Sequence, residues 1–132
     1  MAKPTLLIFT KPPRIGLAKT RLADSIGRTE ARRIARWMQA RAMRAANGTE
    51  WRARLLVEPP GARHETLGGL WPAHFDRFPQ SRGNLGDRMA AAMQAAPPGP
   101  VIFIGTDAPG MSRSLIAQAA RALRTSDAVF GP

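Results

Sequence analysis

Cysteine and tyrosine are absent from the 132-residue sequence, and no apolar run approaches the length of a membrane span. Without cysteine the chain forms neither disulfides nor thiolate metal sites, so a bound metal would need oxygen ligands or the two histidines, His64 and His74. The apolar run from Leu6 to Phe9 is shorter than the roughly 7 residues of a secretory signal core and far shorter than the roughly 18 of a membrane span. These absences predict a cytoplasmic protein without a membrane partner.

Acidic residues are also scarce, with 9 Asp and Glu against 20 Lys and Arg, which gives a formal net charge of +11. The excess is uneven, because residues 1–54 contain 13 basic and 3 acidic side chains while residues 55–132 contain 7 and 6. Such an asymmetry indicates an anionic partner, which can be nucleic acid, an acidic membrane surface or a phosphorylated small molecule. Composition alone does not choose among them.

Short apolar runs predict the strands. The sequences TLLIFT (Thr5–Thr10) and VIFIG (Val101–Gly105) are continuous and flanked by breakers, as in strands that are buried on both faces. Weaker strand patterns lie at residues 54–58 and 74–78, and another strand is expected to begin at Ala128.

Apolar residues at helical spacing predict three helices between these strands. The first begins at Thr29 as N-cap and ends at Asn47-Gly48, the second spans residues 85–96, and the third runs from Ser112 as N-cap to Leu123. Residues 64–70 form a short helix or an irregular segment. Alternation of strands and helices, in a chain long enough for one core, predicts a single α/β domain over residues 1–132 with a mainly parallel sheet and helices on both faces.

Ligands of parallel sheets collect at the carboxyl ends of the strands, so the loop after the first strand is informative. It reads KPPRIGLAKTRL. Glycine allows backbone amides to approach an anion closely, and cationic side chains neutralise phosphate oxygens. Ala18 stands where the Walker pattern requires glycine, so this is not a P-loop. The candidate phosphate-binding residues are Lys11, Arg14, Gly16, Lys19 and Arg21. The alternative is an exposed basic loop without a ligand.

Two further loops follow predicted strands. Asp107, two residues after the end of the VIFIG strand, is the candidate ligand of Mg²⁺ or Mn²⁺, although an Asx-turn or a cap for the next helix explains it equally simply. The segment QSRGNLGDRM, residues 80–89, contains Gly83, Asn84 and Gly86 at a junction of strand and helix, where amides could bind a phosphate or face a base. A tight turn capped by Asn84 is the structural alternative.

The three loops together resemble one family. FTKPPRIGLAKTRLA, QSRGNLGDRM and VIFIGTDAPGMS, in this order and spacing, are similar to the CofC-like, DUF2064 group of the GT-A nucleotide-diphospho-sugar transferase superfamily. The resemblance covers essentially the whole chain. Molybdenum-cofactor nucleotidyltransferases and phospholactate guanylyltransferases are more distant relatives.

This resemblance implies a Rossmann-like, three-layer α/β/α domain of the GT-A type. It implies that Lys19 and Arg21 contact phosphate oxygens and that Asp107 is the metal-binding aspartate, with Mg²⁺ or Mn²⁺ as cofactor. The partner would be a nucleoside triphosphate or a nucleotide-sugar, and the reaction a glycosyl or a nucleotidyl transfer. The sequence identifies no catalytic residue and leaves the base, the sugar and the acceptor open.

Two departures from the family pattern qualify this expectation. Asn84 replaces the usual aspartate, and family members continue beyond Pro132 with a segment like Asp-Gly-Gly-Tyr, which would supply a second acidic metal ligand. We therefore expect the fold to be incomplete at the carboxyl terminus and catalysis to be impaired. An uncovered last strand would leave apolar surface or an unpaired edge, which is compatible with a homo-oligomer.

Two other functions stay open from the sequence. A truncated nucleotide-binding protein without catalytic activity is one alternative. A basic nucleic-acid-binding module is the other, and it is disfavoured because Trp37, Trp51 and Trp71 are not interleaved with the cations as a stacking platform requires.

The basic loop gives a direct prediction. Replacing Lys19→Ala removes a charge-assisted bond to phosphate, so the affinity for nucleotide should fall by about 1–3 kcal/mol. Isothermal titration calorimetry measures this loss. Unchanged affinity would remove Lys19 from the phosphate site.

Overall fold

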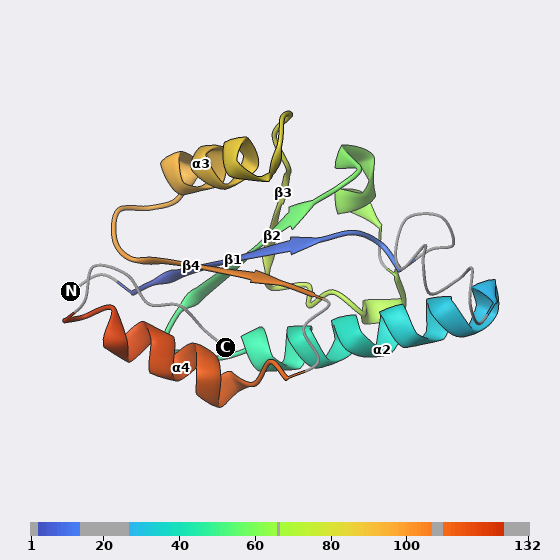
Figure 1. Cartoon of the computed structure of the whole chain (residues 1–132), viewed down its shortest axis with the longest axis horizontal. Helices are drawn as coiled ribbons and strands as arrows, with labels where there is room; N and C mark the ends of the chain where they lie inside the picture. Colours follow the sequence, from blue (N-terminus) through green and yellow to red (C-terminus); the bar gives the residue numbers. More distant parts are fainter. Residues whose placement is uncertain (1–2, 14–26, 66, 107–109, 126–132) are drawn as a thin grey trace.

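The computed structural model describes residues 3–13, 27–65, 67–106 and 110–125 of the chain. Strands and helices alternate along it, as Figure 1 shows. The elements are β1 (Thr5–Thr10), α2 (Arg28–Ala46), β2 (Arg52–Val57), the 3₁₀ turns η1 (Pro60–His64) and η2 (Leu67–Gly69), β3 (Asp76–Pro79), α3 (Leu85–Ala95), β4 (Val101–Gly105) and α4 (Arg113–Ala122).

The four strands form one parallel sheet in the spatial order β3-β2-β1-β4. β1 pairs with β2 from Thr5 opposite Arg52 to Thr10 opposite Val57, and β4 pairs with the other side of β1. The chain thus builds the sheet outward from β1 to β3 and returns through α3 to the far side of β1. In such sheets ligands bind at the carboxyl ends of the strands, beside the point where the strand order reverses, which here lies between β1 and β4.

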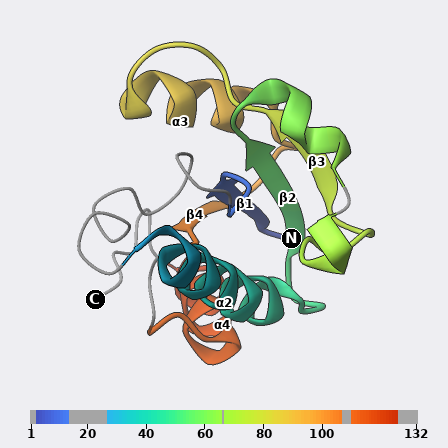
Figure 2. The ribbon, with the colours of Figure 1, turned by 90° about the vertical axis from the view of Figure 1, so that its right-hand side faces the viewer.

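Helices cover both faces of the sheet, and the side chains of β1 alternate between two cores. α2 and α4 lie on one face and α3 on the other, as Figures 1 and 2 show. Leu6 and Ile8 belong to the larger core with residues of α2 and α4, whereas Leu7 packs in the smaller core with Ala92 of α3. Because β1 is covered on both faces, its sequence is a continuous apolar run instead of an alternating one.

The fold agrees with the expected three-layer α/β domain, and most element bounds agree as well. β1 and β4 have the predicted bounds, β2 begins two residues earlier than predicted, and β3 is shifted by up to two residues. The capping residues Asn84 and Ser112 of α3 and α4 are confirmed, since each side chain accepts a hydrogen bond from a backbone N–H of the first turn. The predicted cap of the first helix is wrong, because Thr29 lies inside α2 and Gly27 is its N-cap.

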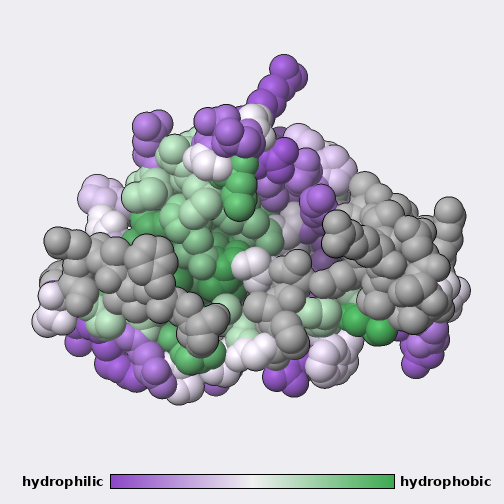
Figure 3. All heavy atoms as spheres, in the orientation of Figure 1, coloured by the Kyte–Doolittle hydropathy of each residue, from purple (hydrophilic) through white to green (hydrophobic). Residues whose placement is uncertain are grey.

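An apolar surface lies between α3 and β4, visible as the green area of Figure 3. Val101 and Phe103 of β4 are only partly buried there, and the ring of Phe103 stacks on Phe9 with the centroids 5.9 Å apart. Leu85 and Met93, which the helical pattern places on the buried face of α3, are instead 64% and 53% exposed. Within the described part of the sheet, β4 is an edge strand. The strand predicted at Ala128 lies outside the described residues.

α2 has a basic surface. Its arginines are exposed, which is the solvated arrangement that explains much of the charge excess: Arg32, Arg33, Arg36, Arg41 and Arg44. Trp51 and Trp71 are buried, while Trp37 is 54% exposed with the Arg41 guanidinium 5.1 Å from its ring centre. None of the described helices combines the length and the apolarity that crossing a bilayer requires.

One buried polar side chain ties α2 to the end of β1. Gln39 is only 4% exposed, and its Oε1 accepts hydrogen bonds from the indole Nε1 of Trp71 at 3.0 Å and from the hydroxyl of Thr10 at 3.4 Å. Its Nε2 donates to the backbone carbonyl of Lys11. Buried polar groups without partners are costly, so this set of bonds fixes the backbone where β1 ends.

Removing this amide should destabilise the domain. Gln39→Leu keeps the volume but leaves the Trp71 indole and the Lys11 carbonyl without their partner, so the free energy of unfolding should fall by about 1–3 kcal/mol. Urea denaturation measures it. The control Gln94→Leu changes an exposed glutamine of α3 and should stay within about 0.5 kcal/mol of the wild type. Equal effects of both substitutions would contradict the role of Gln39.

Candidate functional site

A polar residue directly follows each strand at the carboxyl edge of the sheet: Lys11 after β1, Glu58 after β2, Gln80 after β3 and Thr106 after β4. The parallel ladder continues one step beyond the strands. The backbone N–H of Glu58 donates to the Thr10 carbonyl at 3.1 Å, and that of Gln80 donates to the Val57 carbonyl at 3.0 Å. The ladder therefore fixes where Glu58 and Gln80 leave the sheet.

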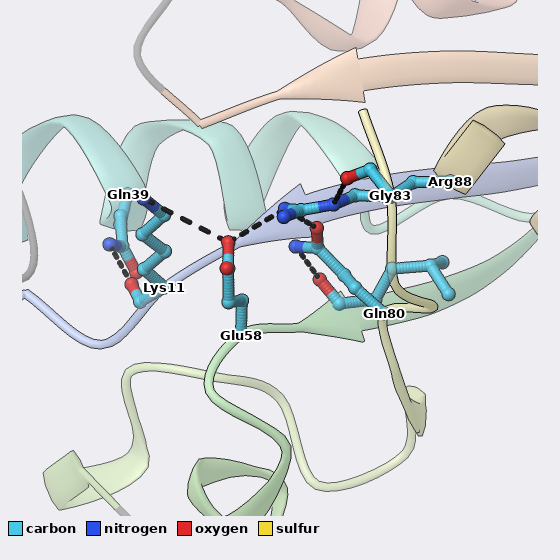
Figure 4. Close-up of polar contacts among 7 residues, drawn as sticks. Lys11, Gln39, Glu58, Gln80, Gly83 and Arg88 are labelled. Carbon is cyan, nitrogen blue, oxygen red and sulfur yellow. Dashed lines mark hydrogen bonds and ion pairs between the residues drawn. The ribbon is translucent and has the colours of Figure 1, made fainter. Parts of the chain in front are cut away.

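Glu58 lies between two cations from different parts of the chain, as Figure 4 shows. Its Oε2 is 2.9 Å from the NH1 of Arg88, on α3, and 3.9 Å from the Nζ of Lys11. The side chains of Glu58 and Arg88 are 34% and 28% exposed, and that of Lys11 is 51% exposed. Together these three side chains carry a net charge of +1.

Arg88 also holds the turn between β3 and α3. Its NH1 donates to the Oε1 of Gln80 at 3.1 Å and its Nε to the carbonyl of Gly83 at 3.0 Å. Gln80 in turn donates from Nε2 to the Leu56 carbonyl at 3.0 Å. Through these bonds and the ion pair with Glu58, the ends of β2 and β3 and the start of α3 form one connected network.

The amino terminus of α3 is closed by a capping box. The Asn84 Oδ1 accepts a hydrogen bond from the backbone N–H of Asp87 at 2.9 Å, and the Asn84 N–H donates to the Asp87 Oδ2 at 3.1 Å. Gly83 has a φ of 109°, and a Cβ at this position would collide with the Asp87 carboxylate. The structural interpretation of Asn84 as a cap is thus confirmed, and Gly83 is required for the close approach of the turn to Asp87.

The ends of β1 and β4 meet at two hydroxyl groups. The Thr10 hydroxyl lies 3.5 Å from the Thr106 hydroxyl, although the two residues are 96 positions apart. Thr106 is directly followed by Asp107, the candidate metal ligand, which lies outside the described residues. Among the residues that the structure describes, no group of three or more His, Asp or Glu side chains is close enough to hold a metal ion.

The described part of the chain contains only some of the predicted site residues. Lys11, Gly83, Asn84 and Gly86 are described, and Lys11 is connected to the Gly83 turn through the Glu58 and Arg88 network. The remaining predicted residues lie outside the described residues: Arg14, Gly16, Lys19, Arg21 and Asp107.

Sequence reasoning missed three members of this edge, namely Glu58, Arg88 and the buried Gln39. A signal was present for Glu58, because it is the polar residue directly after an apolar strand, the same position as that of Lys11. No local signal marks Gln39, whose bond to the Lys11 carbonyl spans 28 residues. Arg88 lies within the segment QSRGNLGDRM, but its ion pair with Glu58, 30 residues away, has no local signal.

Comparison with known proteins shows the family. The chain belongs to the bacterial family described as "Uncharacterized protein conserved in bacteria (DUF2064)", whose model matches residues 40–132. No curated protein matches the chain.

A solved structure is similar over almost the entire chain. It is a protein from Desulfovibrio desulfuricans G20 whose name proposes a nucleotide-diphospho-sugar transferase, and it is 28% identical with a TM-score of 0.79. The similarity covers 95% of this chain and 56% of that protein, so the chain spans little more than half the length of its relative. This chain therefore shares the α/β fold of the part of that protein which it covers.

The Gly83 turn gives a prediction that is independent of any ligand. Gly83→Ala should lower the free energy of unfolding by about 1–3 kcal/mol, because the positive φ and the contact with Asp87 both oppose a side chain. Gly61→Ala is the matched control, since a Cβ there meets no atom within 4 Å. Chemical denaturation of the two variants measures the difference, and equal stability would contradict the strained geometry of Gly83.

Proposed function

We propose that this chain forms the nucleotide-binding part of a nucleotide-dependent transferase, which binds a nucleoside triphosphate or a nucleotide-sugar. The observation that carries the proposal is the convergence of Lys11, Glu58 and Arg88 at the carboxyl edge of a parallel sheet whose strand order reverses beside β1. The similarity to the nucleotide-diphospho-sugar transferase fold supports the same conclusion.

The phosphate groups belong at the loop that follows β1. Lys11 begins this loop. Its ammonium group is half exposed, and its one ion pair with a described residue is the loose one to Glu58, so it can turn toward an anion. Lys19 and Arg21, farther along the same loop, add two more cations, and Gly16 allows backbone amides to approach. Charge-assisted bonds from several such donors suit a polyphosphate.

The turn before α3 suits the base or the ribose better than a phosphate. The capping box already uses the N–H groups of Asn84 and Asp87, and the Asp87 carboxylate places a negative charge at the helix start. A phosphate there would meet this charge, whereas a neutral base or a ribose hydroxyl would not. The Gly83 to Gly86 segment therefore contacts the nucleoside in this proposal.

In this proposal a divalent metal would bind beside the ends of β1 and β4. Asp107 would hold Mg²⁺ or Mn²⁺, and the neighbouring hydroxyls of Thr10 and Thr106 are oxygen donors of the kind that hard cations prefer. When bound, such a cation offsets the charge on the diphosphate of the nucleotide. Lys11 and the loop cations would orient the phosphates, and the fixed turn would orient the nucleoside.

The class of reaction follows from this arrangement and is part of the proposal. A nucleotide held by its phosphates and its nucleoside reacts at a phosphorus atom or at the anomeric carbon of an attached sugar. Positioning and electrostatic stabilisation supply most of the catalysis in either case. The arrangement serves nucleotidyl and glycosyl transfer alike, and the proposal covers both.

A thermal-shift screen tests the proposal. Nucleoside triphosphates and nucleotide-sugars at about 100 times their Kd should raise the Tm by several degrees, and Mn²⁺ should enlarge the shift because Asp107 and the phosphates would share the ion. Asp107→Asn should remove the enhancement by Mn²⁺ and leave metal-free binding largely intact.

Nucleic acid is the discriminating control in the same screen. Binding of oligonucleotides should be weak and should fall steeply with salt, since it depends on counterion release. Sequence-selective binding of DNA or RNA near physiological salt, without any response to nucleotides, would replace the transferase proposal by a nucleic-acid-binding one.

A further inference from the structure

A carboxylate lies at the centre of the edge to which the proposed function assigns an anionic ligand. Glu58 is the side chain on which Lys11 and Arg88 converge, and both cations approach the same oxygen, Oε2. Two like-signed groups within a few ångströms repel each other, so a carboxylate beside Lys11 reduces the affinity of that lysine for phosphate. A purely phosphate-binding site would be better served by glutamine at this position.

The two ion pairs of Glu58 differ in strength. Arg88 is 2.9 Å away, less exposed, and anchored by further bonds to Gln80 and Gly83. Lys11 is 3.9 Å away, is half exposed, and has no other ion pair among the described residues. A loose, exposed pair contributes little and is readily exchanged for a better partner, whereas Arg88 would lose several bonds by leaving.

The two cations also belong to different parts of the site. Lys11 starts the loop assigned to the phosphates, and Arg88 holds the turn assigned to the nucleoside through the Gly83 carbonyl. Glu58 is the residue that touches both. Removing the charge of Glu58 should therefore strengthen the binding of the phosphates and weaken the binding of the nucleoside.

We propose that Glu58 is a positioning and specificity-determining residue, which holds Arg88 and the nucleoside-binding turn in place while it restrains Lys11 from binding inorganic phosphates. The proposal rests on the proposed function and names its selectivity: the site prefers a complete nucleotide to free pyrophosphate. A nucleotide compensates for the repulsion from Glu58 because its nucleoside contacts the ordered turn. Pyrophosphate has no nucleoside, so it bears the same repulsion without that compensation.

Glu58→Gln tests this selectivity, because glutamine keeps the size of the side chain and removes its charge. Pyrophosphate should bind about twofold to fivefold more tightly, which corresponds to the loss of one exposed ion pair at Lys11. The nucleotide for this test is the one among ATP, GTP, CTP and UTP that binds the wild type most tightly. The ratio of its affinity to that of pyrophosphate should fall about tenfold, because Arg88 loses its charged anchor and the turn loosens. Isothermal titration calorimetry of both ligands gives the two affinities.

Two further variants separate the parts of the effect. Arg88→Lys keeps the charge but cannot make the bonds to Glu58, Gln80 and Gly83 together, so it should weaken nucleotide binding and leave pyrophosphate binding unchanged. Glu50→Gln is the matched control, because it removes an equal charge from an exposed pair with Arg121 that precedes β2. It should change neither affinity.

The outcomes distinguish the two proposals. If the wild type binds neither nucleotides nor pyrophosphate, the proposed function fails and the selectivity fails with it. If the wild type binds nucleotides but Glu58→Gln changes both ligands by the same factor, or weakens pyrophosphate, the role of Glu58 is overturned while the proposed function stands. If Glu58→Gln does not fold, the Arg88→Lys variant decides, since an equal loss of both ligands there contradicts the separation of the two parts.

Discussion

The position of β1 in the sheet determines the rest of the molecule. β1 is paired on both edges, with β2 and with β4, and covered on both faces, so every side chain from Thr5 to Ile8 is buried. Parallel partners require crossover connections, and those that contain α2 and α3 run in opposite directions along the sheet, so the two helices lie on opposite faces. The same pairing brings the carboxyl ends of four strands to one edge. The pairing of β4 with β1 is what brings together residues far apart in sequence, such as Thr10 and Thr106.

The fold was largely predictable because its strongest constraints are local. Burial on both faces leaves continuous apolar runs in β1 and β4, and one-sided burial leaves helical periodicity in α2, α3 and α4. β3 was harder to place because it lies at a sheet edge and contains charged residues, so its pairing with β2 and not its composition defines it. The start of α2 was misplaced because Gly27 caps it without a side-chain hydrogen bond, and the sequence rule looks for a polar side chain.

The candidate site was predictable only in part, because many of its contacts join residues that are far apart in the sequence. Lys11 and Gly83 are marked by motifs that are continuous in sequence, so local chemistry is enough to single them out. Glu58 and Arg88 form their ion pair across 30 residues, and Gln39 meets the Trp71 indole across 32. Such partners become neighbours only after the strand order is known, and the order of parallel strands is a property of the whole sheet.

The segment QSRGNLGDRM shows how one motif serves a structural purpose that also suits the proposed contact with a nucleoside. Side chains of a helix tilt toward its amino terminus, so Arg88, in the first turn of α3, reaches back over the turn to the Gly83 carbonyl and to Glu58. Asn84 and Asp87 close the helix, and Gly83 leaves room for the Asp87 carboxylate. The spacing of the motif is therefore set by helix geometry. A turn fixed in this way loses little conformational freedom when a ligand contacts it, and less of the interaction energy is spent on ordering the protein.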